Sequence, residues 1–407
     1  MRIFFKLPSI NLVNIWIYAV LLSIIARLVF WIFTIFYPIP NETGLLISPL
    51  LANSGIDLNF YINESIRFKT YIINLINFNF PITQNSLEHI ESLKKIHEFT
   101  VGDYVPTEIQ FSPGIFFPIL LLLTNFVNIP WILSFCYLIF SSYLIYISIK
   151  WLNNKKVSWY WLFLYGLLPV PFWYMINISP DLLFSLIVTI FIINISSDKK
   201  ESNNKLFYLF FLSIVSIMLK PNGVSLLIFV FYFFIFRNFL NINYKLPIIL
   251  ISILIFLIFI YFYNEYLISY IVSSNSGRLI FGYYQIDYLN GIYSFIPNYL
   301  NKFFSIISLL IAKFIYFSGI RPTFGDTLDF LVLIRSLAGI IILPGIFWLF
   351  LKANNNIRIF TIIFLFPIML GLAQERYSLP IYPLLFYYGT IFYTFIFKNI
   401  YNVFRRF

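Results

Sequence analysis

Long apolar runs separated by short polar segments constrain this 407-residue chain more than any other feature. A helix needs about 20 apolar residues to cross the roughly 30 Å hydrocarbon core of a bilayer. Runs of about that length lie at 11–36, 131–150, 157–176, 180–196, 205–220, 222–240, 246–265, 329–351, 357–373 and 378–397. The first run is too long for the apolar core of a signal peptide, so we expect it to remain as an anchor. The sequence therefore predicts an all-α polytopic membrane protein with about ten transmembrane helices.

Composition excludes several other classes of protein. Hydrophobic residues make up 60% of the chain and charged residues 11%, whereas a water-soluble domain is about half apolar and a quarter charged. Aromatic residues reach 22%, which suits lipid contact and interfacial belts. A single cysteine, Cys136, excludes an internal disulfide and a cysteine-based metal cluster. The net charge of +11 is scattered between apolar runs, so no nucleic-acid partner is predicted.

Lys and Arg residues predict the orientation, because cytoplasmic loops carry an excess of them. Two shorter apolar stretches, 113–129 and 303–319, would place basic loops outside if they crossed fully. We therefore interpret them as juxtamembrane or re-entrant helices. With ten spans, both termini and fifteen of the 27 basic residues are cytoplasmic. These are Arg2, Lys6, Lys150, Lys155, Lys156, Lys199, Lys200, Lys205, Arg237, Lys245, Lys352, Arg358, Lys398, Arg405 and Arg406.

This topology leaves two long outer segments, 37–130 and 266–328, within a single membrane-embedded domain covering 1–407. The cytoplasmic loops are short, and the sequence contains no glycine-rich phosphate loop. We therefore expect any chemistry to face outward, toward a periplasm or lumen. The richness in Ile, Asn, Lys, Phe and Tyr is typical of an AT-rich genome and favours the inner membrane of a bacterial cell envelope.

The first outer segment contains the strongest candidate for a general base. Asp57, Tyr61 and Glu64 are spaced i, i+4 and i+7, which places them on one face of an amphipathic surface helix. A carboxylate there can accept a proton from a hydroxyl group. The structural alternative is that Asp57 caps or solvates the helix. Asp103 is a second candidate acid, with a turn residue as its structural alternative.

The same segment holds both histidines, His89 and His97, among glutamates. A solvated helix explains them, and we do not favour a metal site or any cofactor. The pair Pro113-Gly114 opens the shorter apolar stretch, as expected for a re-entrant helix buried against protein.

Three further charged side chains lie at the predicted outer ends of spans. Asp181 begins one span, where its charge complements the helix dipole. Lys220 joins two spans near the level of lipid headgroups, where its ammonium either meets a phosphate or snorkels to water. Arg376, followed by Tyr377, precedes the last span with a guanidinium suited to phosphate. Its alternative role is to pair with Glu375 or Asp329.

Taken in order, these elements resemble the GT-C superfamily of membrane glycosyltransferases, which take a sugar from a polyprenyl-phosphate carrier. The Arg376-Tyr377 ending with Pro380 and Pro383 is similar to the protein O-mannosyltransferase and lipid A aminoarabinose transferase branch. The segments 116–118 and 220–223 look more like the GPI mannosyltransferase II branch. The acidic pair or Trp-Asp common in the first loop of these families is absent here, because Asp57 stands between Ile56 and Leu58. The acceptor class therefore does not carry over.

The resemblance implies roles for individual residues. Asp57 would be the base that activates the acceptor hydroxyl in an inverting transfer. Arg376 and Lys220 would hold the carrier phosphate and stabilise its developing charge, with Tyr377 beside them. Tyr61 would shape the sugar pocket. The partners would be a polyprenyl-phosphate-sugar donor, a lipid, glycan or protein acceptor, and membrane lipids.

Two other functions remain open at this stage. An O-antigen ligase or polymerase also carries arginines in a late outer loop, here Arg278 and Arg321. Its working acid and histidine would be expected in that loop, whereas both histidines of this chain lie in the first outer segment. A lipid or sugar transporter would show repeated halves and helices broken at the midplane. The sequence has no matching halves, and its polar residues cluster at the outer edge.

Overall fold

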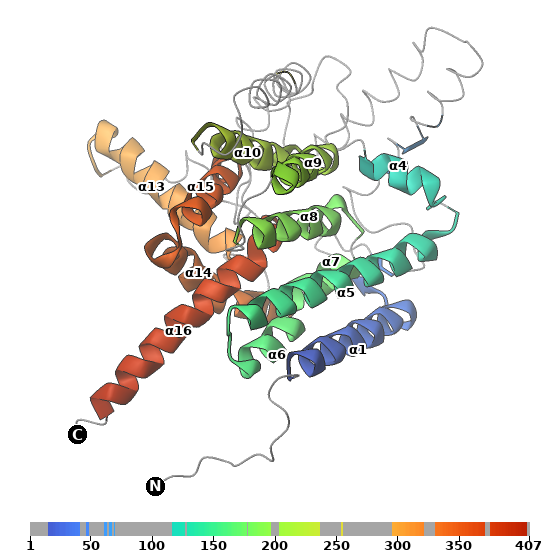
Figure 1. The fold of residues 1–407 in the computed structure, drawn as a ribbon, viewed down its shortest axis with the longest axis horizontal. Coiled ribbons are helices and arrows are strands. Elements are labelled where there is room, and N and C mark those ends of the chain that lie inside the picture. The colour runs from blue at the N-terminus through green and yellow to red at the C-terminus, as the bar shows by residue number, and fades with distance from the viewer. Residues whose placement is uncertain are drawn as a thin grey trace.

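The computed structural model describes residues 15–40, 46–48, 61–62, 65–66, 69, 116–126, 128–176, 178–196, 203–236, 254, 295–320, 330–370 and 375–404. These residues are mostly helical (Figure 1). One short antiparallel pair of strands joins β1 (Ile39–Pro40) to β2 (Leu46–Ile47). The α-helical expectation is therefore confirmed for this part of the chain.

The described helices occur in the following order along the chain. They are α1 (Ile15–Phe36), α4 (Phe116–Leu123), α5 (Pro130–Asn154), α6 (Trp159–Leu167), α7 (Pro169–Ile176), α8 (Pro180–Ile195), α9 (Asn203–Leu219), α10 (Val224–Phe236), α13 (Asn298–Phe317), α14 (Phe330–Lys352), α15 (Asn355–Leu370) and α16 (Tyr382–Phe404). Three single-turn 3-10 helices complete the set: η2 (Pro221–Gly223), η3 (Glu375–Tyr377) and η4 (Leu379–Ile381).

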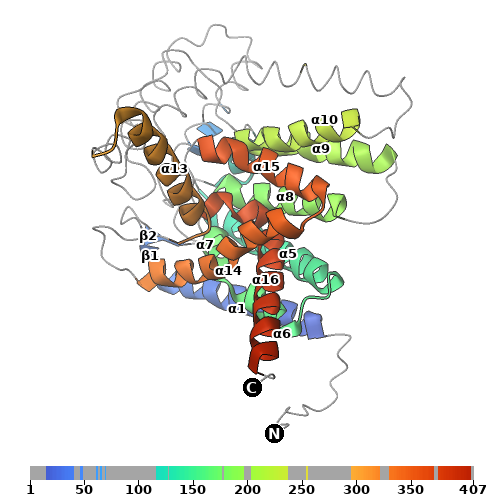
Figure 2. The ribbon, with the colours of Figure 1, turned by 90° about the vertical axis from the view of Figure 1, so that its left-hand side faces the viewer.

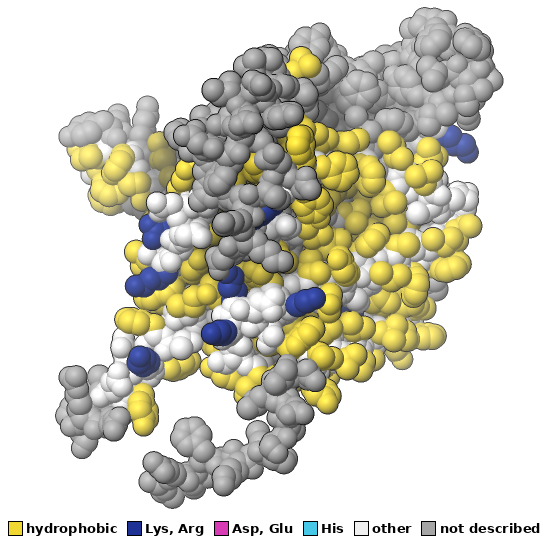
Figure 3. All heavy atoms as spheres, viewed as in Figure 1, with side chains coloured by type: hydrophobic (Ala, Val, Ile, Leu, Met, Phe, Trp, Pro, Cys, Tyr) yellow, Lys and Arg dark blue, Asp and Glu magenta, His cyan; other side chains and the backbone are white. Residues whose placement is uncertain are grey.

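Three of these helical segments are long and apolar enough to cross a membrane: Ile15–Phe36, Pro130–Asn154 and Leu379–Asn402. Shorter apolar segments occur in α8, α9, α10, α13, α14 and α15. Hydrophobic side chains occupy a broad area at the centre and right of the face shown in Figure 3, and a few Lys and Arg side chains lie mostly in its left half. Helix α1 contributes large exposed side chains such as Ile25 and Val29 to the apolar surface. These features are those of a membrane protein.

Helix α16 runs through the core and packs closely on α14, while α9 and α10 lie side by side at the edge away from α1 (Figures 1 and 2). Glycines allow the close α14–α16 contact. A Cβ atom on Gly345 would lie 2.1 Å from the carbonyl oxygen of Leu385, and one on Gly389 would lie 2.4 Å from that of Ile341. Small residues serve this purpose in membrane helix pairs, because they let two backbones approach.

Eight of the predicted apolar runs each correspond to one helix, and the run 246–265 lies outside the described residues apart from residue 254. The prediction of a single helix over 157–176 is wrong. Two helices, α6 and α7, meet there at Leu168, which has an extended backbone (φ −61°, ψ 137°). Pro169 explains the break, because proline lacks an N–H and disfavours helical geometry in the residue before it.

The break between α6 and α7 is stabilised by a buried arginine that the sequence analysis missed. Arg27, in the middle of α1, is fully buried and donates from Nη1 to the carbonyl oxygen of Gly166 at 2.9 Å. The Ser23 hydroxyl donates to the same carbonyl at 2.8 Å. The last carbonyls of a helix lack partners within it and carry partial negative charge. Arg27 therefore satisfies the interrupted end of α6.

The two shorter apolar stretches, 113–129 and 303–319, form helices of different length. Within 113–129, α4 has eight residues, about 12 Å, and then turns, so it is too short to cross a bilayer. Its Phe117 and Leu121 are buried in a cluster with α5 and α8, as expected for a helix packed against protein. The stretch 303–319 forms most of α13, which has 20 residues and is longer than predicted.

Candidate functional site

Polar side chains gather where α8 begins, α9 ends and the turns η2, η3 and η4 meet. The start of α8 follows from its sequence. Ser179 has an extended backbone, Pro180 occupies the first helical turn, and Asp181 is the acidic residue of that turn. Proline suits this position because its missing N–H has no helical partner there, and the carboxylate complements the helix dipole.

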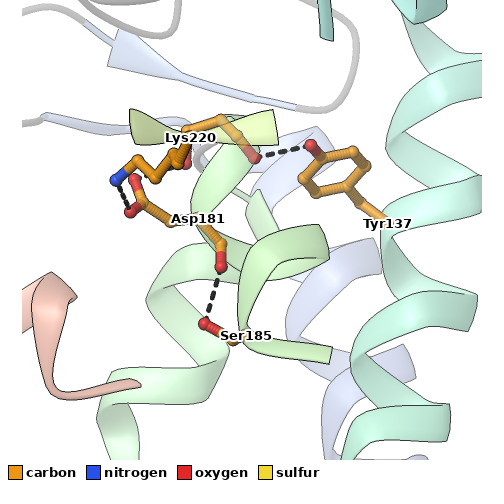
Figure 4. A network of polar contacts seen from close by, with 5 residues as sticks. Tyr137, Asp181, Ser185 and Lys220 are labelled. Carbon is orange, nitrogen blue, oxygen red and sulfur yellow. Dashed lines mark hydrogen bonds and ion pairs between the residues drawn. The ribbon is translucent and has the colours of Figure 1, made fainter. Parts of the chain in front are cut away.

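Asp181 and Lys220 form an ion pair at this point (Figure 4). The carboxyl side chain is 4% exposed and the lysine side chain 12%, so both are largely withdrawn from solvent. Of all the side chains that the structure describes, that of Asp181 is the single carboxylate. The pair therefore brings together opposite charges that are rare inside a bundle of this kind.

Hydrogen bonds fix the acidic partner of this pair (Figure 4). The Ser179 hydroxyl donates to Oδ2 of Asp181 at 3.1 Å, and the Ser185 hydroxyl donates to the Asp181 carbonyl at 2.6 Å. Buried Tyr137, on α5, donates its hydroxyl to the carbonyl of Ser179 at 2.6 Å. These contacts hold the carboxylate at the first turn of α8 and tie that turn to α5.

A tight turn fixes the backbone of the basic partner. The Lys220 amide donates to the carbonyl of Ser216 at 2.9 Å, and the Gly223 amide donates to the carbonyl of Lys220 at 2.9 Å. A Cβ atom on Gly223 would lie 2.3 Å from the carbonyl carbon of Ser216, so this position requires glycine. The turn at Lys220–Gly223 is therefore fixed in a conformation that places the lysine side chain beside the start of α8.

Tyr377 brings the second cation of the site close to Lys220. The Lys220 ammonium lies 4.8 Å from the centre of the Tyr377 ring, and the Arg376 guanidinium carbon lies 5.3 Å from it. A cation within about 6 Å of a tyrosine ring is attracted by its π electrons. The Tyr377 ring is thus close to both cations, one of which, Lys220, is paired with Asp181.

Tyr61 packs against α4. Its ring contacts that of Phe117 edge to face, with centroids 4.9 Å apart. It packs on a buried cluster that includes Tyr137, Ile178 and Leu219. Ile178 precedes Asp181 by three residues, and Leu219 precedes Lys220 directly. Tyr61 therefore packs on the same buried cluster as residues that lie close in sequence to the ion pair.

The structure thus brings together three of the predicted site residues, Lys220, Arg376 and Tyr377, and packs Tyr61 on a cluster that includes Leu219. It gives Lys220 an acidic partner, Asp181, which neither predicted role of this lysine, contact with a phosphate or snorkelling to water, included. Asp57 and Asp103, with both histidines, lie outside the described residues. A helix is predicted around Asp57. The described residues that follow Asp57 are helical: Tyr61, Ile62, Ser65, Ile66 and Lys69.

Neither the pairing of Asp181 with Lys220 nor the hydrogen bond from Tyr137 to the start of α8 was predicted from the sequence. A signal for the pairing was present, because one residue begins a predicted span and the other ends the next one. Consecutive antiparallel helices place those two ends at the same level. Within the described residues, no group of three or more His, Cys, Asp or Glu side chains is arranged to hold a metal ion.

The arrangement can bind an anion through two cations and can present hydroxyl groups from tyrosines beside it. A phosphate is an anion of this type, because lysine meets it as a point charge and arginine as a planar fork. In comparisons with known proteins, no family model, no curated protein and no solved structure matches the chain.

Proposed function

We propose that this protein is an inverting membrane glycosyltransferase of the GT-C type, which moves a sugar from a polyprenyl-phosphate donor to an acceptor at the outer face. The observation that carries the proposal is the pair of cations on one ring. The Lys220 ammonium and the Arg376 guanidinium carbon lie within 5.3 Å of the centre of the Tyr377 ring. Two cations held this close together are suited to bind the phosphate of a lipid-linked sugar.

A membrane setting strengthens the argument. Ionisable side chains inside membrane helices are rare, face the bundle interior and mark functional sites. The proposed topology has about ten spans, cytoplasmic termini and an outward site in a bacterial inner membrane. The start of α1 and the end of α16 lie toward the same side of the molecule in both ribbon views, as this topology requires (Figures 1 and 2).

In the proposed reaction the acceptor hydroxyl attacks the anomeric carbon of the donor sugar, and the bond from that carbon to the phosphate oxygen breaks. Arg376 and Lys220 stabilise the charge that develops on the leaving phosphate. Asp57 accepts the proton of the acceptor hydroxyl, a role that rests on the resemblance to GT-C enzymes. Tyr61 lines the sugar pocket. A partly dehydrated site makes these charge contacts stronger than they are in water.

A lipid or sugar transporter is the second candidate, and the broken helix favours it. Transporters often bind their substrate where a helix is interrupted. Here, however, the break at Leu168 is filled by Arg27 and Ser23 rather than left open to a ligand. A transporter would move the lipid without cleaving a bond, so product analysis separates the two functions.

The test is turnover by the purified protein in lipid nanodiscs with a panel of labelled polyprenyl-phosphate hexoses and pentoses and an extract of membrane acceptors. We expect one donor to yield free polyprenyl phosphate in an acceptor-dependent manner. Asp57→Asn should fold, bind the lipid and turn over about 10²-fold more slowly, because an amide cannot take the proton. Glu64→Gln is the matched control and should cost much less. Normal turnover in Asp57→Asn would remove Asp57 from the mechanism, and Asp103 would be tested next.

A further inference from the structure

The charge on the phosphate changes during the proposed reaction. The donor is a phosphodiester with one negative charge. When the bond from the anomeric carbon to oxygen breaks, its electron pair stays on that oxygen. The product is then a phosphomonoester with about two negative charges near neutral pH. The acceptor proton leaves on the general base, so the phosphate site must accept one additional negative charge.

The two cations of the site are held in different ways. The Arg376 guanidinium carbon lies 5.3 Å from the centre of the Tyr377 ring. Lys220 instead binds the Asp181 carboxylate while it lies over the same ring. The carboxylate is held by Ser179 and cannot follow the lysine far, whereas the lysine has a flexible four-carbon stem.

We propose that Asp181 is a built-in competitor for the carrier phosphate: it holds Lys220 while the singly charged donor is bound and releases it to the doubly charged product. This inference rests on the proposed function and adds a role for Asp181 in it. Lys220 then strengthens its contact with the phosphate as the leaving group departs, which favours the transition state over the bound donor. Because the carboxylate competes for the lysine, it also helps the product to leave. Asp181 is thus a positioning residue for Lys220.

The experiment compares two lipid probes of the same chain length, polyprenyl phosphate and its methyl phosphodiester, which carry about two charges and one charge. Dissociation constants are measured at pH 8 with the whole protein in uncharged nanodiscs. We expect Asp181→Asn to bind the monoester about 5–10-fold more tightly and the diester only about 2-fold, because one competing charge has gone. Lys220→Gln should weaken the monoester more than the diester, and the double variant should behave as Lys220→Gln alone.

The control is Lys352→Gln, since Lys352 also lies over an aromatic ring, 5.7 Å from the centre of that of Trp348, outside the proposed site. It should leave both constants unchanged. A folded Asp181→Asn variant that binds the monoester no more tightly than the wild type would overturn the inference. If that variant does not fold, Lys220→Gln decides, because an unchanged preference for the monoester contradicts the exchange. If the wild type binds neither lipid, the proposed function itself fails.

Discussion

Two buried cations in this molecule have opposite surroundings. Arg27 is fully buried in α1, and its described partners are neutral oxygens: the Ser141 hydroxyl at 3.1 Å, the Ser23 hydroxyl and carbonyl, and the Gly166 carbonyl. Lys220 retains some exposure and is paired with a carboxylate. Both lie over aromatic rings, Arg27 at 4.3 Å from the centre of Phe172 and Lys220 at 4.8 Å from that of Tyr377.

On our proposal, the difference separates a structural cation, Arg27, from an exchangeable one, Lys220. Arg27 joins α1 to α5 and to the interrupted end of α6, and every one of these contacts is lost if it moves. Lys220 is paired with the carboxylate of Asp181, and under our proposal a phosphate replaces that carboxylate. The comparison teaches that burial of a charge does not reveal its role, whereas the nature of its partners does.

The largest effect should come from the structural cation. We expect Arg27→Met to lower the free energy of unfolding by about 3 kcal/mol, because several buried hydrogen bonds from a charged donor are lost together. Thermal unfolding of the detergent-solubilised protein measures this. Ser141→Ala removes a single contact and should cost about 1 kcal/mol. A fully stable Arg27→Met variant would show that Arg27 is not what holds the end of α6.

The next effect belongs to the second cation of the site. Arg376→Lys keeps the charge but loses the planar fork, so turnover should fall about 10-fold while thermal stability stays close to that of the wild type. Steady-state kinetics with the donor that the nanodisc turnover assay selects measures the first quantity. If Arg376→Ala bound the carrier with unchanged affinity, this residue would leave the proposed site.

The smallest effect concerns the ring that both cations share. Tyr377→Leu removes two cation–π contacts at a partly exposed position and should weaken binding of polyprenyl phosphate about 2–5-fold. Tyr377→Phe keeps the ring and serves as the control. Equal losses in the two variants would assign the effect to the tyrosine hydroxyl instead.

The sequence predicted most of the helices but neither the break in one of them nor its buried arginine. Hydropathy averages over a window, so Pro169 was absorbed into an apolar run although it carried the signal for the break. Arg27 was likewise overlooked inside the first run, where a charge is itself informative. Flanking prolines and polar residues did single out Lys220 and Arg376. Their convergence on Tyr377, and the pairing with Asp181, depends on tertiary contacts that no local pattern contains.

The central claim is that Lys220 and Arg376 together hold a lipid phosphate, and direct binding of polyprenyl phosphate tests it. The double variant Lys220→Gln/Arg376→Gln is compared with Lys352→Gln/Arg358→Gln, which removes the same charge at the turn between α14 and α15. We predict at least about 30-fold weaker binding for the first variant, since two charged contacts are lost, and less than about 2-fold for the second. Equal affinities in the two folded variants would contradict the account.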